Sequence, residues 1–242
     1  ITQNGTTQII SGFTTTDPDS VSVIIALDLS SSLTSAIESI KTAAKYFINQ
    51  LDDADEAAIC KFKSVVNTYP TVAPLLGVTD ATGKIALTDY VDLAFNVSEG
   101  TALYNAVYDS ITRVIAGTKT KKAVLLLSDG ANTITSGRTL TEAITYAKAQ
   151  NVPIFTVYFV DSAHASSAKP AIMKQLATET GGQDFYADTM TMEAIFGQIS
   201  ALLSKKYTIT YTPTSCTGSP FLEVGAQSGI LTGLDTKSVV FP

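Results

Sequence analysis

A carboxylate and a group of serine hydroxyls stand where an apolar run of the sequence ends. The run VSVIIALD ends at Asp28, and Ser30 and Ser32 follow at alternate positions. Because alternate residues of an extended segment point the same way, one carboxylate and two hydroxyls can converge on one point. Such an all-oxygen cluster suits a hard cation such as Mg²⁺. Taken alone, the pattern favours helix capping over a metal site, since a serine can accept N–H bonds from the first turn of a helix.

Two further positions carry similar chemistry. Thr101 follows a glycine at the start of the helical pattern GTALYNAV, and Asp129 ends the apolar run AVLLLSD. In an open parallel sheet, ligands bind at the carboxyl ends of strands where the strand order reverses. Since Asp28 and Asp129 both stand at such ends, we expect them to share one edge of a sheet.

The segments around these residues predict an α/β fold. Short apolar runs alternate with segments of helical period, which is typical of a parallel sheet covered on both faces. We therefore predict a doubly wound, mostly parallel six-stranded sheet flanked by helices. The predicted helices span residues 33–51, 101–115, 140–150, 168–180 and 190–203.

The two ends of the chain have a different pattern. Both are rich in Thr, alternate polar with apolar residues and are broken by turns, which favours β-strands. We predict that they form a small antiparallel β-element packed on the core. The expected boundaries are residues 21–205 for the α/β domain, with 1–20 and 206–242 as the terminal extension.

The five oxygen-bearing residues resemble a known family. Asp28-x-Ser30-x-Ser32, Thr101 and Asp129, in this order and spacing, are similar to the metal-ion-dependent adhesion site of von Willebrand factor type A domains. The resemblance covers roughly residues 21–205 and implies a bound Mg²⁺, with Mn²⁺ or Ca²⁺ as alternatives. It implies direct binding by the hydroxyls of Ser30 and Ser32, direct or water-mediated binding by Thr101, and mainly water-mediated binding by the two aspartates.

The resemblance also implies a function. An open coordination position would capture an Asp or Glu side chain of a partner protein, such as an extracellular-matrix or surface protein, and Tyr104 and Asn132 would lie on the ligand-binding rim. The family often has glycine at the position of Ser31 and methionine at that of Leu33. We expect a non-enzymatic module without catalytic residues, extracellular or on a bacterial cell surface or pilus, as part of a larger protein.

Two other functions are weighed against adhesion. One is a structural scaffold whose metal only stabilises the loop, and the other is a metal-dependent phosphoester hydrolase. The hydrolase is disfavoured because an aspartyl nucleophile needs an acid partner nearby, and the position two residues after Asp28 is Ser30.

The charge and hydropathy of the chain disfavour some partners. Sixteen basic against twenty-two acidic residues give a net charge of -6, which disfavours nucleic acid and anionic membrane surfaces. No apolar run approaches the roughly 20 residues of a membrane helix, so no membrane insertion is expected in this piece. Cys60 and Cys216 could form a disulfide or both be free.

A few other polar residues are given ordinary structural roles. We expect His164 to be a solvated loop residue, and Asp161 and Asp188 to cap helices. The acidic run at residues 52–56 lacks the spacing of a calcium loop and is expected to be a solvated turn.

Overall fold

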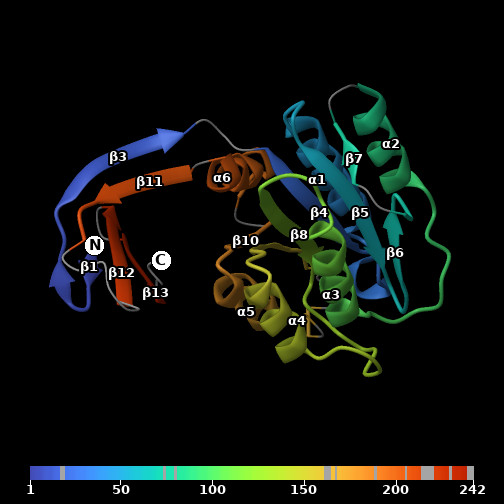
Figure 1. Ribbon diagram of the computed structural model, residues 1–242. Coiled ribbons are helices and arrows are strands. Elements are labelled where there is room, and N and C mark those ends of the chain that lie inside the picture. The colour runs from blue at the N-terminus through green and yellow to red at the C-terminus, as the bar shows by residue number, and fades with distance from the viewer. Residues whose placement is uncertain are drawn as a thin grey trace. The chain divides into compact units, whose positions relative to one another are not determined.

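In a computed structural model, the chain folds into two units, each containing its own β-strands (Figure 1). One unit comprises Ile1–Pro18 and Lys205–Pro242, and the other comprises Asp19–Ser204. The structure describes residues 1–16, 20–72, 75–78, 81–160, 165–166, 168–187, 190–204, 206–213, 221–228 and 231–238. Asp161, His164, Asp188 and Cys216 lie outside the described residues.

The larger unit is built on a mostly parallel sheet. Its main path runs in the order β10 (Asp184–Tyr186), β9 (Ile154–Tyr158), β8 (Lys121–Ser128), β4 (Val21–Asp28), β5 (Glu56–Phe62) and β6 (Val66–Tyr69). Neighbouring strands from β10 to β5 are parallel, whereas β6 and the short β7 (Leu76–Gly77) pair antiparallel with β5. The predicted α/β fold with a mostly parallel sheet is confirmed.

Alternation along the central strand explains why helices cover both faces of this sheet. Val23, Ile25 and Leu27 pack in one core cluster, and Ile24 and Ala26 pack in the other. The first cluster includes residues of α1 (Ile37–Gln50), α2 (Ala81–Asp92) and α6 (Met192–Ser204). The second includes residues of α3 (Leu103–Val114), α4 (Leu140–Ala149) and α5 (Pro170–Thr180). Strand β4 is therefore apolar on both faces from Val23 to Leu27, directly before Asp28.

Three details differ from the expectations. The helix expected from residue 33 begins at Ile37, after a 3₁₀ turn η1 (Ser31–Leu33). The expectation of a solvated turn at residues 52–56 is wrong for Asp55 and Glu56, which are 7 % and 5 % exposed. Asp55 accepts a hydrogen bond from the backbone N–H of Val21, so it holds the start of β4 beside the start of β5. Helix α2 was not among the expected helices.

The smaller unit contains antiparallel strands from both ends of the chain. One sheet has the order β13 (Leu231–Ser238), β12 (Phe221–Ser228), β1 (Thr2–Gln3) and β2 (Thr6–Thr7). The other pairs β11 (Lys206–Tyr211) with β3 (Ile10–Thr16). The predicted pairing of the termini in antiparallel β-structure is confirmed. Among the described residues, no helix combines the length and apolar character needed to cross a bilayer.

Candidate metal-binding site

The strand order of the larger unit places the predicted site at a topological switch point. Strand β4 lies between β5 and β8. After β4 the chain continues through α1 to β5 on one side, and after β8 it continues through α4 to β9 on the other side. Helices α1 and α4 pack on opposite faces, so the loops that follow β4 and β8 diverge. Asp28 is the last residue of β4 and Asp129 directly follows β8, so both lie at the carboxyl edge where such sheets bind ligands.

Asp28 is completely buried, and both of its carboxylate oxygens accept hydrogen bonds. Oδ1 accepts from the backbone N–H of Ser30 at 3.0 Å, and Oδ2 accepts from the hydroxyl of Ser128 at 2.6 Å. Burial raises the pKa of Asp28 to about 6, although the hydrogen bonds from Ser128 and Ser30 act in the opposite direction. The nearby Asp129 raises it further. The carboxylate is thus positioned but costly to ionise without a cation.

The two serines of the motif lie side by side. Their Oγ atoms are 3.1 Å apart, and Ser30 is only 2 % exposed. Ser30 precedes η1, but its side chain makes no capping hydrogen bond there. The capping interpretation is therefore wrong for Ser30, and its hydroxyl is directed to Ser32 and Asp28.

Asp129, directly after β8, is almost completely buried. Its Oδ1 accepts a hydrogen bond from the N–H of Ala131 at 2.9 Å, and the residue is 1 % exposed. No hydrogen-bond partner for Oδ2 is found in the described part of the chain. An unsatisfied buried polar atom of this kind costs roughly 1–3 kcal/mol, and it calls for an explanation such as an ion or water. The orphaned oxygen is what a cation at this edge would use.

Thr101 is held next to the loop that follows Asp129. It is 3 % exposed, its N–H donates to Oγ1 of Thr133 at 2.8 Å, and its carbonyl accepts from the N–H of Thr133 at 2.9 Å. The next residue, Ala102, donates its N–H to the carbonyl of Lys63 at 2.7 Å. Segments that follow β5 and β8 therefore fix the start of α3 at the same edge.

The two predicted rim residues contact each other. The amide oxygen of Asn132 accepts from the N–H of Tyr104 at 3.3 Å, and its amide nitrogen donates to the carbonyl of Ile134 at 2.8 Å. Asn132 thus uses both ends of its amide to hold the loop. Tyr104 is half-buried, and this burial raises the pKa of its hydroxyl.

The residue types fit a hard divalent cation. Two carboxylates and three hydroxyls, from Asp28, Ser30, Ser32, Thr101 and Asp129, are carried by segments that hydrogen bonds tie together at one sheet edge. Oxygen donors of this kind are what Mg²⁺, Mn²⁺ and Ca²⁺ prefer. No cluster of three or more His, Cys, Asp or Glu that could hold a metal exists among the residues that the structure describes.

Sequence reasoning missed Ser128 as part of this arrangement. Its fully buried hydroxyl donates to Asp28 and accepts from the N–H of Gly130 at 3.0 Å, so it links the two aspartate-bearing strands. The signal for it was present, because a hydroxyl directly precedes Asp129 at the end of an apolar strand.

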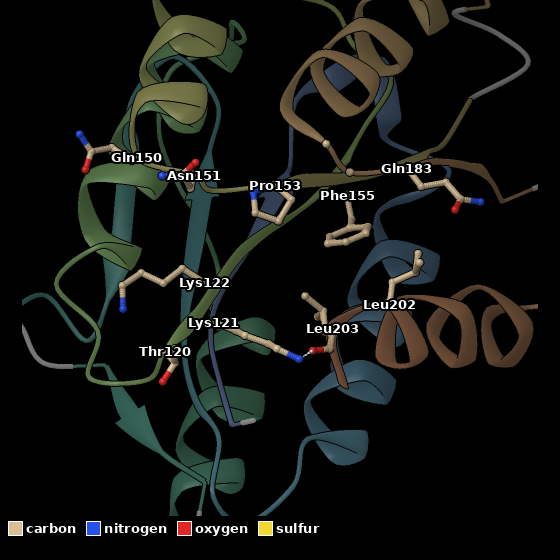
Figure 2. A pocket seen from close by; sticks show the side chains of 12 residues that line it. Thr120, Lys121, Lys122, Gln150, Asn151, Pro153, Phe155, Gln183, Leu202 and Leu203 are labelled. Atoms are coloured by element: carbon tan, nitrogen blue, oxygen red, sulfur yellow. Dashed lines mark hydrogen bonds between the residues drawn. The ribbon is translucent and has the colours of Figure 1, made fainter. Parts of the chain in front are cut away.

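A separate cavity of about 590 Å³ lies at the opposite end of the sheet, by the first residues of β8 and β9 (Figure 2). Its described lining contains Lys121 and Lys122 but no acid, histidine or cysteine. Figure 2 shows the ammonium group of Lys121 reaching the carbonyl of Leu203 near the end of α6, at 2.7 Å. This cavity lacks the donors of a cation site and is distinct from the carboxyl-edge cluster.

Comparison with known proteins identifies the family. The family model described as von Willebrand factor type A domain matches residues 22–199, so the chain belongs to the von Willebrand factor type A family. No curated protein matches the chain.

Solved structures share the fold at low sequence identity. The von Willebrand factor type A protein from Catenulispora acidiphila superimposes with a TM-score of 0.61 and 19% identity, covering 79% of this chain and 44% of its own. The pilus adhesin SpaC from Lactobacillus rhamnosus GG, in an open conformation, gives a TM-score of 0.53 and 14% identity, covering 76% and 30%. Proximal thread matrix protein 1 from the mussel byssus, solved with a zinc-occupied MIDAS motif, superimposes with a TM-score of 0.62 and 12% sequence identity. The match covers 84% of this chain and 50% of that protein. This chain therefore spans less than half the length of the first of these relatives.

Proposed function

We propose that this chain is a non-enzymatic, divalent-cation-dependent binding module that captures an acidic side chain of a partner protein. The proposed metal residues are Asp28, Ser30, Ser32, Thr101 and Asp129, and Mg²⁺ is the preferred ion, with Mn²⁺ or Ca²⁺ as alternatives. The observation that carries the proposal is the buried Oδ2 of Asp129, which has no partner within the described residues. A relative of the same fold has a zinc-occupied MIDAS motif, which supports a divalent cation here.

The charge of the donors favours capture of an anion. A bound ion would supply a Lewis-acidic position open to one further oxygen ligand. The hydroxyls of Ser30, Ser32 and Thr101 are neutral, and the carboxylate of Asp28 is already shared with Ser30 and Ser128. If Asp28 and Asp129 act mainly through water, the donors in direct contact with the ion are the neutral hydroxyls, so the site would retain affinity for a carboxylate from outside.

The proposed setting is extracellular or cell-surface, in a bacterial protein larger than this chain. A pilus adhesin shares the fold, and this chain covers 30% of its length. The proposed partner is a surface or extracellular-matrix protein that exposes an Asp or Glu.

The first experiment is calorimetric titration of Mg²⁺, Mn²⁺ and Ca²⁺ into chelator-treated protein. Ser30→Ala removes a proposed ligand, and Ser136→Ala is the matched control because Ser136 is an exposed serine of the loop after β8. We expect saturable binding in the wild type and in the Ser136 variant, and none in the Ser30 variant. Equal binding by both variants would refute this ligand set.

A second experiment separates capture from a structural role of the metal. The probe is an immobilised glutamate-containing peptide, with its glutamine counterpart as control, at saturating Mg²⁺. Ser32→Asp adds a carboxylate to the site, so it should tighten Mg²⁺ binding and weaken retention of the probe. If Ser32→Asp binds Mg²⁺ more tightly but is retained on the glutamate peptide as strongly as the wild type, the scaffold function is favoured instead. Turnover of a phosphoester that is lost in Asp28→Ala would favour the hydrolase.

A further inference from the structure

Thr101 and Thr133 are joined by reciprocal hydrogen bonds at the carboxyl edge of the sheet. The N–H of Thr101 donates to Oγ1 of Thr133 at 2.8 Å, and the N–H of Thr133 donates back to the carbonyl of Thr101 at 2.9 Å. The same carbonyl accepts from the N–H of Ile134 at 3.1 Å. Three bonds therefore connect the segment of Thr101 to the loop that begins at Asp129.

Only one of these bonds depends on a side chain, and that side chain is at the surface. Thr133 is exposed, whereas Thr101 is 3 % exposed. A buried N–H that loses its acceptor keeps the full cost of its desolvation. Loss of the Thr133 hydroxyl would therefore act on the buried Thr101 rather than on Thr133 itself.

The residue before Thr101 is fitted closely to the same loop. Gly100 has a φ of 132°, a conformation that residues with a side chain rarely adopt. A Cβ at this position would lie 3.0 Å from Cδ1 of Ile134 and 3.5 Å from Oγ1 of Thr133. Glycine thus lets the segment of Thr101 approach the loop closely enough for the hydroxyl to accept its N–H.

We propose that Thr133 is a positioning residue of the candidate metal site, whose hydroxyl fixes Thr101 relative to the loop of Asp129. This inference rests on the proposed function, because it concerns two of the proposed metal residues. Thr133 lies outside the Asp-x-Ser-x-Ser, Thr and Asp pattern, and it acts through Thr101 rather than by touching the ion. Its effect is that the segments of Thr101 and Asp129 are held as one body.

The test compares three variants of the intact chain. Thr133→Val keeps the shape of the side chain and removes the acceptor, while Thr133→Ser keeps the hydroxyl. Thr135→Val is the matched control, because Thr135 is an exposed threonine two residues further along the same loop. We expect Thr133→Val to weaken Mg²⁺ binding about tenfold, at the lower end of what outer-shell substitutions cost. Thr133→Ser and Thr135→Val should stay within about twofold of the wild type.

A metal-free measurement checks the cause. In chelator-treated protein, the backbone amide of Thr101 should exchange its hydrogen faster in Thr133→Val than in Thr135→Val.

The outcomes distinguish this inference from the proposed function. Wild-type Mg²⁺ binding with no loss in Thr133→Val overturns the inference alone. Equal exchange of the Thr101 amide in Thr133→Val and Thr135→Val also overturns it, since the Thr133 hydroxyl would then not hold that N–H. Absence of Mg²⁺ binding in the wild type overturns the proposed function and, with it, any role of Thr133 in a metal site.

Discussion

Substituting Asp28 by asparagine should stabilise the metal-free protein. Asp28 is fully buried, and burial raises its pKa from 3.8 to about 6. At 1.36 kcal/mol per pKa unit, the ionised carboxylate costs the native state about 3 kcal/mol at pH 7. Asparagine has no such charge, and its amide can still accept from the N–H of Ser30 and donate to Oγ of Ser128.

The sign of the pH dependence follows from proton binding. Between pH 3.8 and about 6 the native protein binds more protons at Asp28 than the unfolded chain does, so the unfolding free energy falls as pH rises through this range. The stabilisation of Asp28→Asn over the wild type should therefore be largest near pH 7 and shrink toward pH 4.

The assay is urea denaturation in the presence of a chelator and again with saturating Mg²⁺. With chelator at pH 7, we expect Asp28→Asn to exceed the wild type in unfolding free energy by about 1–3 kcal/mol, the upper limit being the full ionisation cost. Mg²⁺ at 100 times its dissociation constant adds about 2.7 kcal/mol to a protein that binds it, and the variant should gain less. With saturating Mg²⁺, the difference in unfolding free energy between Asp28→Asn and the wild type should therefore narrow or reverse.

The exposed Asp53→Asn is the control, and it should leave stability nearly unchanged under both conditions. A variant at Asp28 that is less stable than the wild type in chelator would refute the reasoning, because the charge would then not be the dominant cost. An equal gain from Mg²⁺ in the wild type and the variant would show that Asp28 takes no part in cation binding.

Three further predictions concern buried polar groups. Ser128→Ala removes a donor to Asp28 and should lower the unfolding free energy by about 1–3 kcal/mol in urea; no loss would contradict the link between β4 and β8. Glu56→Gln should lower the unfolding free energy by a similar amount in the same assay, because the hydroxyl of Ser22 and the N–H and hydroxyl of Thr118 all donate to the Glu56 carboxylate. An unchanged urea midpoint would contradict this network. Burial lowers the pKa of Lys61 to about 8. Between pH 8 and 10 the unfolded chain therefore binds more protons at this residue than the native protein does, so the unfolding free energy of the wild type in urea should rise relative to that of Lys61→Met. Parallel pH profiles of the two proteins would argue against the lowered pKa.

Much of the sheet could be predicted because its central strands are apolar on both faces. Five consecutive residues in each of β4 and β8, at 23–27 and 123–127, are apolar, and polar residues follow each run. This pattern places Asp28 and Asp129 at strand ends without any knowledge of the fold. Helix α2 was harder to predict, since it buries few apolar side chains, among them Leu87 and Val91.

The partners of the polar groups could not be predicted in the same way. Glu56 looks like part of a solvated acidic turn, but its hydrogen-bond donors come from residues 34 and 62 positions away. Likewise, Thr133 lies 32 positions from Thr101 and Ser128 lies 100 positions from Asp28. Such contacts depend on strand order and register, which local patterns do not specify.

The hydrogen bonds of the site argue for capture over a purely structural metal. The Ser30 N–H holds Asp28, the Ala131 N–H holds Asp129, and the bonds between Thr101 and Thr133 hold the third segment. These contacts link the loops through protein groups. Within the described part of this site, the protein groups leave one buried carboxylate oxygen, Oδ2 of Asp129, without a hydrogen-bond partner. A cation held there would have few anionic ligands, and the remaining positive charge would be directed at a partner's carboxylate rather than at the fold.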